Sequence, residues 1–322
     1  MVKSLETASA AERPLSAEVV APAARKEPRE GAAALGRVVV DVAQLAKLRV
    51  NLLVLLTALT GFLLALPESA PVDLRLLGSL LGATFLLAAS SSSLNQLIET
   101  SRDALMERTR DRPIPSGRVG NGPVLAGGIA GASAGVAWLA LATDLVTASL
   151  GAATLVVYLF VYTPLKRRTP YSLLAGAVAG ALPPVLGWTA ASGGEIGSGA
   201  LVLFAVLFCW QVPHFHAIAW LHRDDYHRGG YRLLAVVDPS GRRLARETVV
   251  YSLLLVVASA APVVTGLARP AFLAAAMALG GVFVAVALRF ARQRSAPPAR
   301  RLLHFSLVYL PALFAAWLVF LR

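Results

Sequence analysis

The feature that most constrains this chain is a succession of long apolar stretches. Nine segments of about 20 mainly apolar residues follow one another, a length that spans a bilayer when it is helical. They are residues 50–66, 74–97, 123–142, 145–163, 172–191, 199–217, 247–267, 270–290 and 302–321. Of the 322 residues, 57% are hydrophobic and 15% are charged, too few for a water-facing surface. The sequence predicts an all-α, polytopic membrane protein with about nine transmembrane helices around a central cavity.

Lysine and arginine are unevenly distributed over the connections between these segments. Of the 30 basic residues, 27 lie before the first segment or after the second, fourth, sixth and eighth, and the exceptions are Arg75, Arg269 and Arg322. The opposite, short loops carry the acidic residues Glu68, Asp73, Asp144 and Glu195. The positive-inside rule therefore predicts a cytoplasmic N-terminus. These loops also explain the net charge of +12, so no nucleic-acid partner is expected.

The N-terminal tail and the cysteine content exclude further classes. Residues 1–40 mix basic side chains with five glutamates and contain no apolar run before Val38, unlike a signal or transit peptide. We expect a disordered cytoplasmic tail over residues 1–40 and a single transmembrane domain over residues 41–322. Cys209 is the only cysteine, which excludes intrachain disulfides and cysteine-based metal sites.

The end of the second segment carries polar residues that a lipid-facing helix would avoid. Asn95, Glu99 and Asp103 recur every four residues, so a helix places them in one stripe, about 6 Å apart. Amide and carboxylate oxygens suit Mg²⁺ that bridges to a phosphorylated ligand, whereas zinc would favour histidine or cysteine. On spacing alone, the alternative that Glu99 and Asp103 are solvated at a helix end stays open.

Basic residues follow this stripe on the same expected face of the membrane. Arg108 and Arg112 lie one helical turn apart, and forked guanidiniums beside a carboxylate-bound cation would form an anion pocket. Tyr162, Lys166 and Arg167 form a second cluster at the end of the fourth segment. Ordinary topology-setting charge is the alternative for the basic residues of both clusters.

Histidines and aspartates gather after the sixth segment. Four of the five histidines lie within residues 214–227, without the i, i+4 pair of a helical zinc site. Asp224 and Asp225 are about 100° apart on a helix, so we expect one of them to face the cleft. That carboxylate would complete a diphosphate clamp opposite Asp103, and plain solvation of the pair is the alternative.

The fifth segment contains small and helix-breaking residues. They are Gly176, Gly180, Pro183, Pro184 and Gly187. Such residues allow helices to approach closely or line a cavity with a kink, and packing alone explains them equally well.

Four motifs resemble those of a known family. They are Asn95-Gln96-x-x-Glu99-x-x-x-Asp103-x-x-Met106-x-Arg108-Thr109-x-x-Arg112-Pro113, Tyr162-Thr163-Pro164-Leu165-Lys166-Arg167, Gly176-Ala177-x-x-Gly180-Ala181-x-Pro183-Pro184-x-x-Gly187-Trp188 and Trp210-Gln211-x-Pro213-His214-Phe215. In this order, within residues 44–321, they closely resemble the heme O synthases, or protoheme IX farnesyltransferases, which are UbiA-type intramembrane prenyltransferases. The resemblance implies farnesyl transfer from farnesyl diphosphate to a vinyl group of heme b, with addition of water, to give heme O and diphosphate.

The resemblance also implies roles for individual residues. The implied catalytic residues are Asn95, Glu99, Asp103, Arg108, Arg112, Lys166 and Asp225. Mg²⁺ would be held by Asn95, Glu99, Asp103 and Asp225, whereas Tyr162, Arg167 and His214 would contact heme b, a substrate rather than a resident cofactor. His214 coincides with the family's Pro-His-Phe pattern and would either ligate the heme iron or hydrogen-bond a carboxylate such as Asp225. His216 would point elsewhere.

The implied setting is a bacterial inner membrane with the N-terminus in the cytoplasm. The expected partners are the two substrates, the lipid bilayer, and heme A synthase or cytochrome oxidase assembly factors. Asp225 is preferred over Asp224 because Asp225-Tyr226 matches the family.

The chain departs from the expected pattern in three places. Glu99 replaces the commoner aspartate, and Lys47-Leu48-Arg49 lacks the usual central proline. Asp225 has no second aspartate four residues away, as the general UbiA-type motif would have. Two rival functions remain. A prenyltransferase of aromatic or quinone precursors would more often pair two aspartates in its second motif, and a transporter would place its polar residues near the midplane.

The charge distribution makes a topological prediction. Reporter fusions at Gly120 and Gly193 should report opposite sides of the membrane, because they fall in connections of opposite charge character. Fusion to a phosphatase active only outside the cytoplasm measures this directly. The same side for both positions would contradict the order of the segments.

Overall fold

A computed structural model describes residues 30–67 and 70–321, and side-chain surroundings from residue 35 onward. Predictions about residues 1–29, Glu68 and Arg322 lie outside the described residues. The chain divides into two units, Met1–Val38 and Val39–Arg322. The second unit contains the helices that follow α1.

Helix α1 (Glu30–Leu45) begins inside the predicted tail. The helix covers residues 30–40 of the expected tail, and both the disordered tail and the single domain over 41–322 stay predictions. Three consecutive alanines and Leu35 favour a helix, and this local preference outweighs the lack of a long apolar run. Lys47 then adopts a left-handed conformation, with φ 45°, and separates α1 from the first spanning helix.

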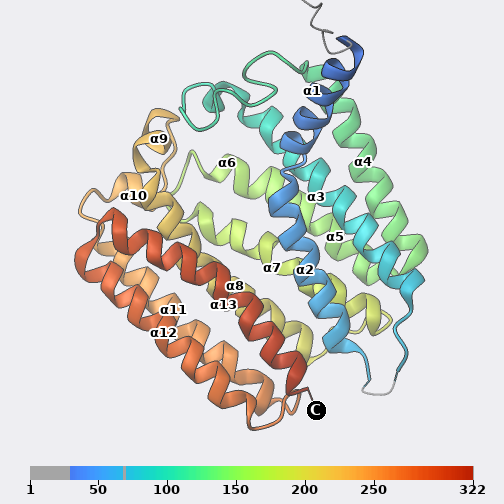
Figure 1. Cartoon of the computed structure of the whole chain (residues 1–322), viewed down its shortest axis with the longest axis vertical. Helices are drawn as coiled ribbons and strands as arrows, with labels where there is room; N and C mark the ends of the chain where they lie inside the picture. Colours follow the sequence, from blue (N-terminus) through green and yellow to red (C-terminus); the bar gives the residue numbers. More distant parts are fainter. Residues whose placement is uncertain (1–29, 68–69, 322) are drawn as a thin grey trace, which may run out of the picture. The chain divides into compact units, whose positions relative to one another are not determined.

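Nine helices within the described residues are long and apolar enough to cross a membrane, which confirms the predicted count. They are α2 (Leu48–Ala65), α3 (Leu74–Asp103), α4 (Asn121–Ala142), α5 (Leu145–Val156) with its continuation to Leu165, α7 (Ser172–Ala191), α8 (Ser198–Leu221), α11 (Arg242–Val264), α12 (Phe272–Gln293) and α13 (Ala296–Val319). The continuation of α5 comprises the π-helix η1 (Val157–Tyr162) and α6 (Thr163–Leu165). Two short helices, α9 (Arg223–Arg228) and α10 (Leu234–Val237), lie between α8 and α11 (Figure 1).

Several helices run past their apolar segments. Helix α3 continues from residue 97 to Asp103, and α11 begins at Arg242 rather than at residue 247. Backbone hydrogen bonding does not depend on side-chain polarity, so a helix continues until a turn-forming residue stops it. The polar stripe of α3 is therefore held on a rigid helix rather than on a loop.

The helices pack around two apolar cores. In one core, side chains of α8 meet those of α11, α12 and α13, with Phe283, Tyr309 and Trp317 fully buried. In the other, α2, α3, α4, α5 and α7 meet around Phe62 and Leu80. Helices α7 and α8 pack against each other and join the two groups (Figure 1).

Close helix contacts depend on glycine at particular positions. A Cβ on Gly187 of α7 would lie 1.9 Å from the Ala58 carbonyl oxygen of α2, and one on Gly61 would lie 1.9 Å from the Pro184 carbonyl oxygen. A Cβ on Gly180 would lie 2.0 Å from Gln211 Oε1 of α8. Close packing therefore explains Gly180 and Gly187, since small residues commonly lie where membrane helices approach each other.

Gly187→Ala should destabilise the protein by about 2–4 kcal/mol, because backbone cannot move away from the added methyl group as a side chain can. Thermal unfolding in detergent micelles measures the change. Gly127→Ala in α4 is the matched control, since nothing lies within 4 Å of its added Cβ. It should be neutral or stabilise by up to about 1 kcal/mol. Equal stability of the two variants would contradict the α2–α7 contact.

Candidate functional site

The polar stripe of α3 faces into the protein. Only 1% of the surface of Asn95, 6% of that of Glu99 and 1% of that of Asp103 is exposed to solvent. The alternative of solvated carboxylates at a helix end is therefore wrong. Gln96 is also buried, and its Nε2 donates to the Leu45 carbonyl oxygen at 2.8 Å. This bond ties the last residue of α1 to the polar end of α3.

Asn95 is held by three other segments. Its Nδ2 donates to Thr163 Oγ1 at 3.1 Å, and its Oδ1 accepts from Lys47 Nζ at 3.2 Å and from the Tyr158 hydroxyl at 3.4 Å. The amide oxygen therefore points toward a buried lysine and a phenol, and its orientation is set by the hydrogen-bond network around it.

Each carboxylate of the stripe pairs with a cation from another part of the chain. Glu99 pairs with Lys166, and both side chains are almost fully buried. Asp103 Oδ2 lies 2.6 Å from Arg112 Nη1. Two of the predicted basic residues thus lie beside the predicted acidic ones, as an anion pocket next to a metal site requires.

The π-helix before Lys166 determines where this lysine lies. Pro164 lacks an amide hydrogen and its ring crowds the preceding turn, which favours a widened π turn. The Tyr162 ring lies over Lys166 Nζ, 4.8 Å from its centroid. A Cβ on Gly176 would lie 2.8 Å from that ring, so this glycine makes room for Tyr162.

The end of α3 and the loop after it meet α9 and the residue that follows it. Asp225 Oδ1 accepts from the Glu107 amide at 3.0 Å and from Arg228 Nη2 at 2.5 Å. Arg108 Nη2 donates to the Tyr226 hydroxyl at 3.1 Å. Arg102 Nη1 donates to the Gly229 carbonyl oxygen at 2.6 Å.

The two adjacent aspartates differ in their surroundings. The side chain of Asp225 is 12% exposed and that of Asp224 is 87% exposed, so Asp225 is the one that faces the protein. Partial burial opposes ionisation, but hydrogen bonds from Arg228 and the Glu107 amide hold the pKa of Asp225 below its usual value. Arg228 therefore pairs with Asp225, the carboxylate that the sequence predicts as a metal ligand.

His214 and His216 face different helices. His214 Nδ1 lies 2.7 Å from Ser306 Oγ of α13, and its ring stacks on Trp210. His216 Nδ1 lies 3.0 Å from Thr248 Oγ1 of α11. The predicted alternative of a bond from His214 to Asp225 is absent from the contacts of the described residues.

Arg167 is exposed beside the buried Lys166. No ion pair or hydrogen bond among the described residues joins it to the acidic stripe. Its predicted heme contact stays a prediction.

The donor set fits a magnesium ion that is shared with a ligand. Within the described part of the chain, no three His, Cys, Asp or Glu side chains are grouped closely enough to hold a metal by themselves. Mg²⁺ is usually held by one or two carboxylates together with substrate phosphates. Glu99, Asp103 and the amide oxygen of Asn95 provide that partial set of hard oxygen donors.

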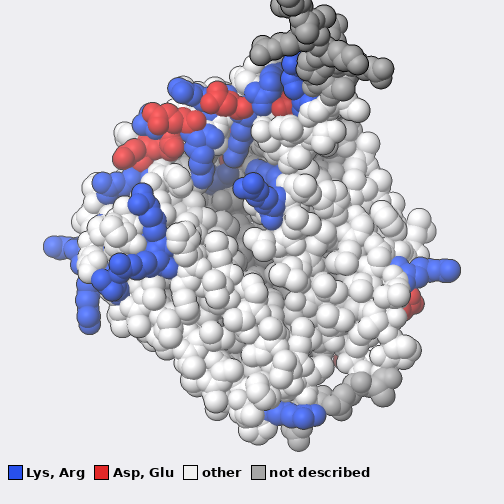
Figure 2. Space-filling view, in the orientation of Figure 1, with Lys and Arg blue, Asp and Glu red and all other residues white. Residues whose placement is uncertain are grey.

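A hollow opens on the face shown in Figure 2. In the orientation of Figure 1 it lies between α2 and α13, and mainly uncharged residues surround it. Lys and Arg side chains gather at its upper end, toward α9 and the loop after α3. A mainly uncharged hollow with cations at one end suits a ligand with an anionic head and an uncharged body.

Sequence reasoning missed three residues of this cluster. Lys47 bonds Asn95, Tyr158 bonds Asn95, and Tyr231 is buried with its ring 5.5 Å from Lys166 Nζ. Burial and the carboxylates of Glu99 and Asp103 raise the pKa of Tyr231. In the sequence, Lys47 is a basic residue directly before a spanning segment. The positive-inside rule is enough to explain such a residue, so it was not assigned to the site.

These features define a class of intramembrane site for amphipathic anions. They are a bundle of membrane-spanning helices, an acidic stripe with paired cations and a mainly uncharged hollow. The model of the UbiA prenyltransferase family matches residues 54–317. A protoheme IX farnesyltransferase of Solibacter usitatus is 41% identical over 287 residues, covering 87% of this chain and 98% of the relative. The chain therefore belongs to the UbiA prenyltransferase family.

Solved structures share the fold at low sequence identity. A digeranylgeranylglyceryl phosphate synthase structure matches with TM-score 0.73 and 12% identity, covering 87% of this chain and 97% of that one. A UbiA homolog from Archaeoglobus fulgidus, bound to GPP and Mg²⁺, matches with TM-score 0.60 and 16% identity, covering 86% and 99%. The predicted fold class and family are thus confirmed, and Mg²⁺ use occurs within the family.

The surroundings of Lys47 lead to a test by pH. Burial, together with Arg112 and Lys166, lowers the pKa of Lys47 from 10.5 to about 8. The unfolded chain binds this proton at higher pH than the folded protein, so stability falls as pH drops from about 10.5 to 8 and is level below 8. Lys47→Met should remove this loss and stabilise the protein at pH 7 by roughly 2–3 kcal/mol.

Lys166→Met is the matched control, because it leaves the buried Glu99 without its cation. It should destabilise by about 3 kcal/mol at pH 7. Chemical unfolding of both variants and of the wild type between pH 7 and 10 measures these differences. A destabilised Lys47→Met protein, or a difference from wild type that does not change with pH, would contradict the position of Lys47.

Proposed function

We propose that this protein transfers a farnesyl group from farnesyl diphosphate to a vinyl group of heme b, with addition of water, to form heme O and diphosphate. The observation that carries this proposal is the buried pairing of Glu99 and Asp103 with Lys166 and Arg112 at the basic end of the helices. The similarity to protoheme IX farnesyltransferases over most of the chain supports the choice of substrates.

The paired groups are arranged to hold a diphosphate. Asn95, Glu99 and Asp103 would hold Mg²⁺, which, when bound, would supply positive charge to the leaving diphosphate. Lys166 and Arg112, which now pair with Glu99 and Asp103, would be free to donate hydrogen bonds to phosphate oxygens if the carboxylates held the metal. Arg108, held by Tyr226, and Asp225 lie on the adjoining loops and would complete the clamp.

The chemistry begins with cleavage of the allylic C–O bond, whose electron pair leaves with the diphosphate. Cations beside the diphosphate lower the barrier because negative charge grows on it during cleavage. The heme vinyl group then attacks the allylic carbon, and water adds to the new cation beside the porphyrin and loses a proton. The mainly uncharged walls of the hollow would keep water from the allylic cation until that attack.

The contacts of His214 leave its second ring nitrogen available as a metal ligand. Ser306 Oγ lies 2.7 Å from the Leu303 carbonyl oxygen and 2.7 Å from His214 Nδ1. If the hydroxyl donates to the carbonyl oxygen, it accepts from Nδ1–H, and Nε2 then carries a lone pair. This arrangement favours the proposal that His214 ligates the heme iron, because such ligands are commonly oriented by a bond at the other ring nitrogen.

The remaining proposals concern setting. The end with most of the Lys and Arg residues would face the cytoplasm of a bacterium, and the protein would span the inner membrane as one domain from residue 41 to 322. Tyr162 and Arg167 would contact heme b, and the product would pass to heme A synthase or to oxidase assembly factors. The polar residues gather at one end of the bundle, whereas a transporter would place them near the midplane.

The membrane heme profile tests the function. A cell that makes this protein but lacks heme A synthase should accumulate a heme more apolar than heme b, detected by chromatography and by the added farnesyl and hydroxyl mass. Asp103→Asn should lower accumulation about 100-fold or more, because it removes charge from the diphosphate site without changing volume. Asp224→Asn is the matched control and should retain activity, since its side chain is 87% exposed.

Metal dependence is measured separately on purified protein. Chelation should abolish farnesyl transfer by the wild type, and added Mg²⁺ should restore it. Full turnover by Asp103→Asn, or a wild type indifferent to chelator, would exclude the proposed metal site.

A further inference from the structure

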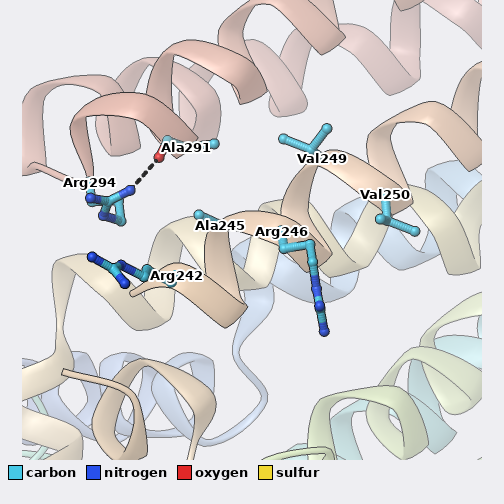
Figure 3. A pocket seen from close by; sticks show the side chains of 7 residues that line it. All are labelled: Arg242, Ala245, Arg246, Val249, Val250, Ala291 and Arg294. Carbon is cyan, nitrogen blue, oxygen red and sulfur yellow. Dashed lines mark hydrogen bonds between the residues drawn. The ribbon is translucent and has the colours of Figure 1, made fainter. Parts of the chain in front are cut away.

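A basic cavity lies between the ends of α11 and α12, away from the carboxylate cluster. Its volume is about 430 Å³, and Arg242 and Arg246 of α11 line it together with Arg294 at the end of α12. Val249 and Val250 line its other end (Figure 3). None of the residues that line this cavity belongs to the proposed farnesyl-transfer site.

The cations of this cavity are only partly neutralised by the protein. Among the described residues, none of the three arginines forms an ion pair, and Arg294 Nη1 donates only to the Ala291 carbonyl oxygen, at 3.0 Å. The neighbouring carboxylate, Glu247, lies 3.9 Å from His216 Nε2 on α8 and interacts electrostatically with Arg246. Three arginines near one carboxylate leave the cavity with a net positive charge.

The cavity lies where lipid head groups meet the protein. The apolar part of α11 begins at Val249, and Arg246 and Arg242 precede it by about 5 and 10 Å of helix. Below the cavity, Val250, Leu254 and Val257 are 46%, 45% and 69% exposed along one side of α11. This apolar stripe continues from the cavity in the direction of the hydrocarbon core.

We propose that this cavity binds an anionic phospholipid, with its phosphate between Arg242 and Arg294 and an acyl chain along Val250, Leu254 and Val257. Arg246, one turn further along α11, points away from these two side chains and adds positive charge beside the head group. Guanidiniums bind phosphate through paired hydrogen bonds, and basic pockets between membrane helices select anionic head groups. The lipid would hold the ends of α11 and α12 together without contacting the farnesyl-transfer site.

The test uses full-length protein in detergent micelles with phosphatidylglycerol as the probe. Native mass spectrometry should show one tightly retained phosphatidylglycerol, which phosphatidylcholine does not replace. Arg242→Gln combined with Arg246→Gln should weaken its binding about 30-fold, since each basic residue contributes roughly a factor of five. Arg294 is left unchanged because it also caps the end of α12.

Arg292→Gln combined with Arg300→Gln is the matched control. Both residues are exposed at the same end of the helices and lie outside the cavity. Their substitution removes as much positive charge as that of Arg242 and Arg246. This variant should bind phosphatidylglycerol within about twofold of the wild type. Equal weakening by both double variants would overturn the proposal in favour of general surface charge, and equal competition by millimolar inorganic phosphate would reject a lipid.

Discussion

The site depends on two buried ion pairs, Glu99 with Lys166 and Asp103 with Arg112. A carboxylate without a partner at this depth would cost several kcal/mol, so each one requires a cation from elsewhere in the chain. The cations come from the loop after α3 and from the end of α6, which forces these segments to converge on one end of α3. Because a diphosphate and a metal could replace both halves of each pair, the charges that stabilise the fold also prepare the site.

This convergence needs helices that approach closely and one helix that is distorted. Gly61 and Gly187 bring α2 and α7 into backbone contact, and Gly176 leaves space for the Tyr162 ring that covers Lys166. The π turn at Val157–Tyr162 presents Tyr158 to Asn95. Small residues and Pro164 therefore act on the site indirectly, by placing larger polar side chains beside the stripe.

Positive charge at this end of the bundle has several separate uses. Lys166 and Arg112 are mostly buried and paired with carboxylates, whereas Arg242 and Arg246 line the cavity for which we propose a lipid ligand. In the sequence all four are compatible with a topology-setting role, although Arg112 and Lys166 also belong to motifs of the site. Their burial and their neighbours distinguish an ion pair in the site from a contact with lipid.

The sequence alone determined the nine spans, the stripe on α3 and the family. Apolar length and residue spacing are local properties, so they can be read without knowing which residues pack together. It also favoured Asp225 over Asp224, by a motif. Only the tertiary structure showed that Lys47 lies beside Asn95, that Ser306 orients His214 and that Arg228 pairs with Asp225. These pairings join segments distant in the chain, or depend on a local turn, so they follow from how the helices pack rather than from any periodicity.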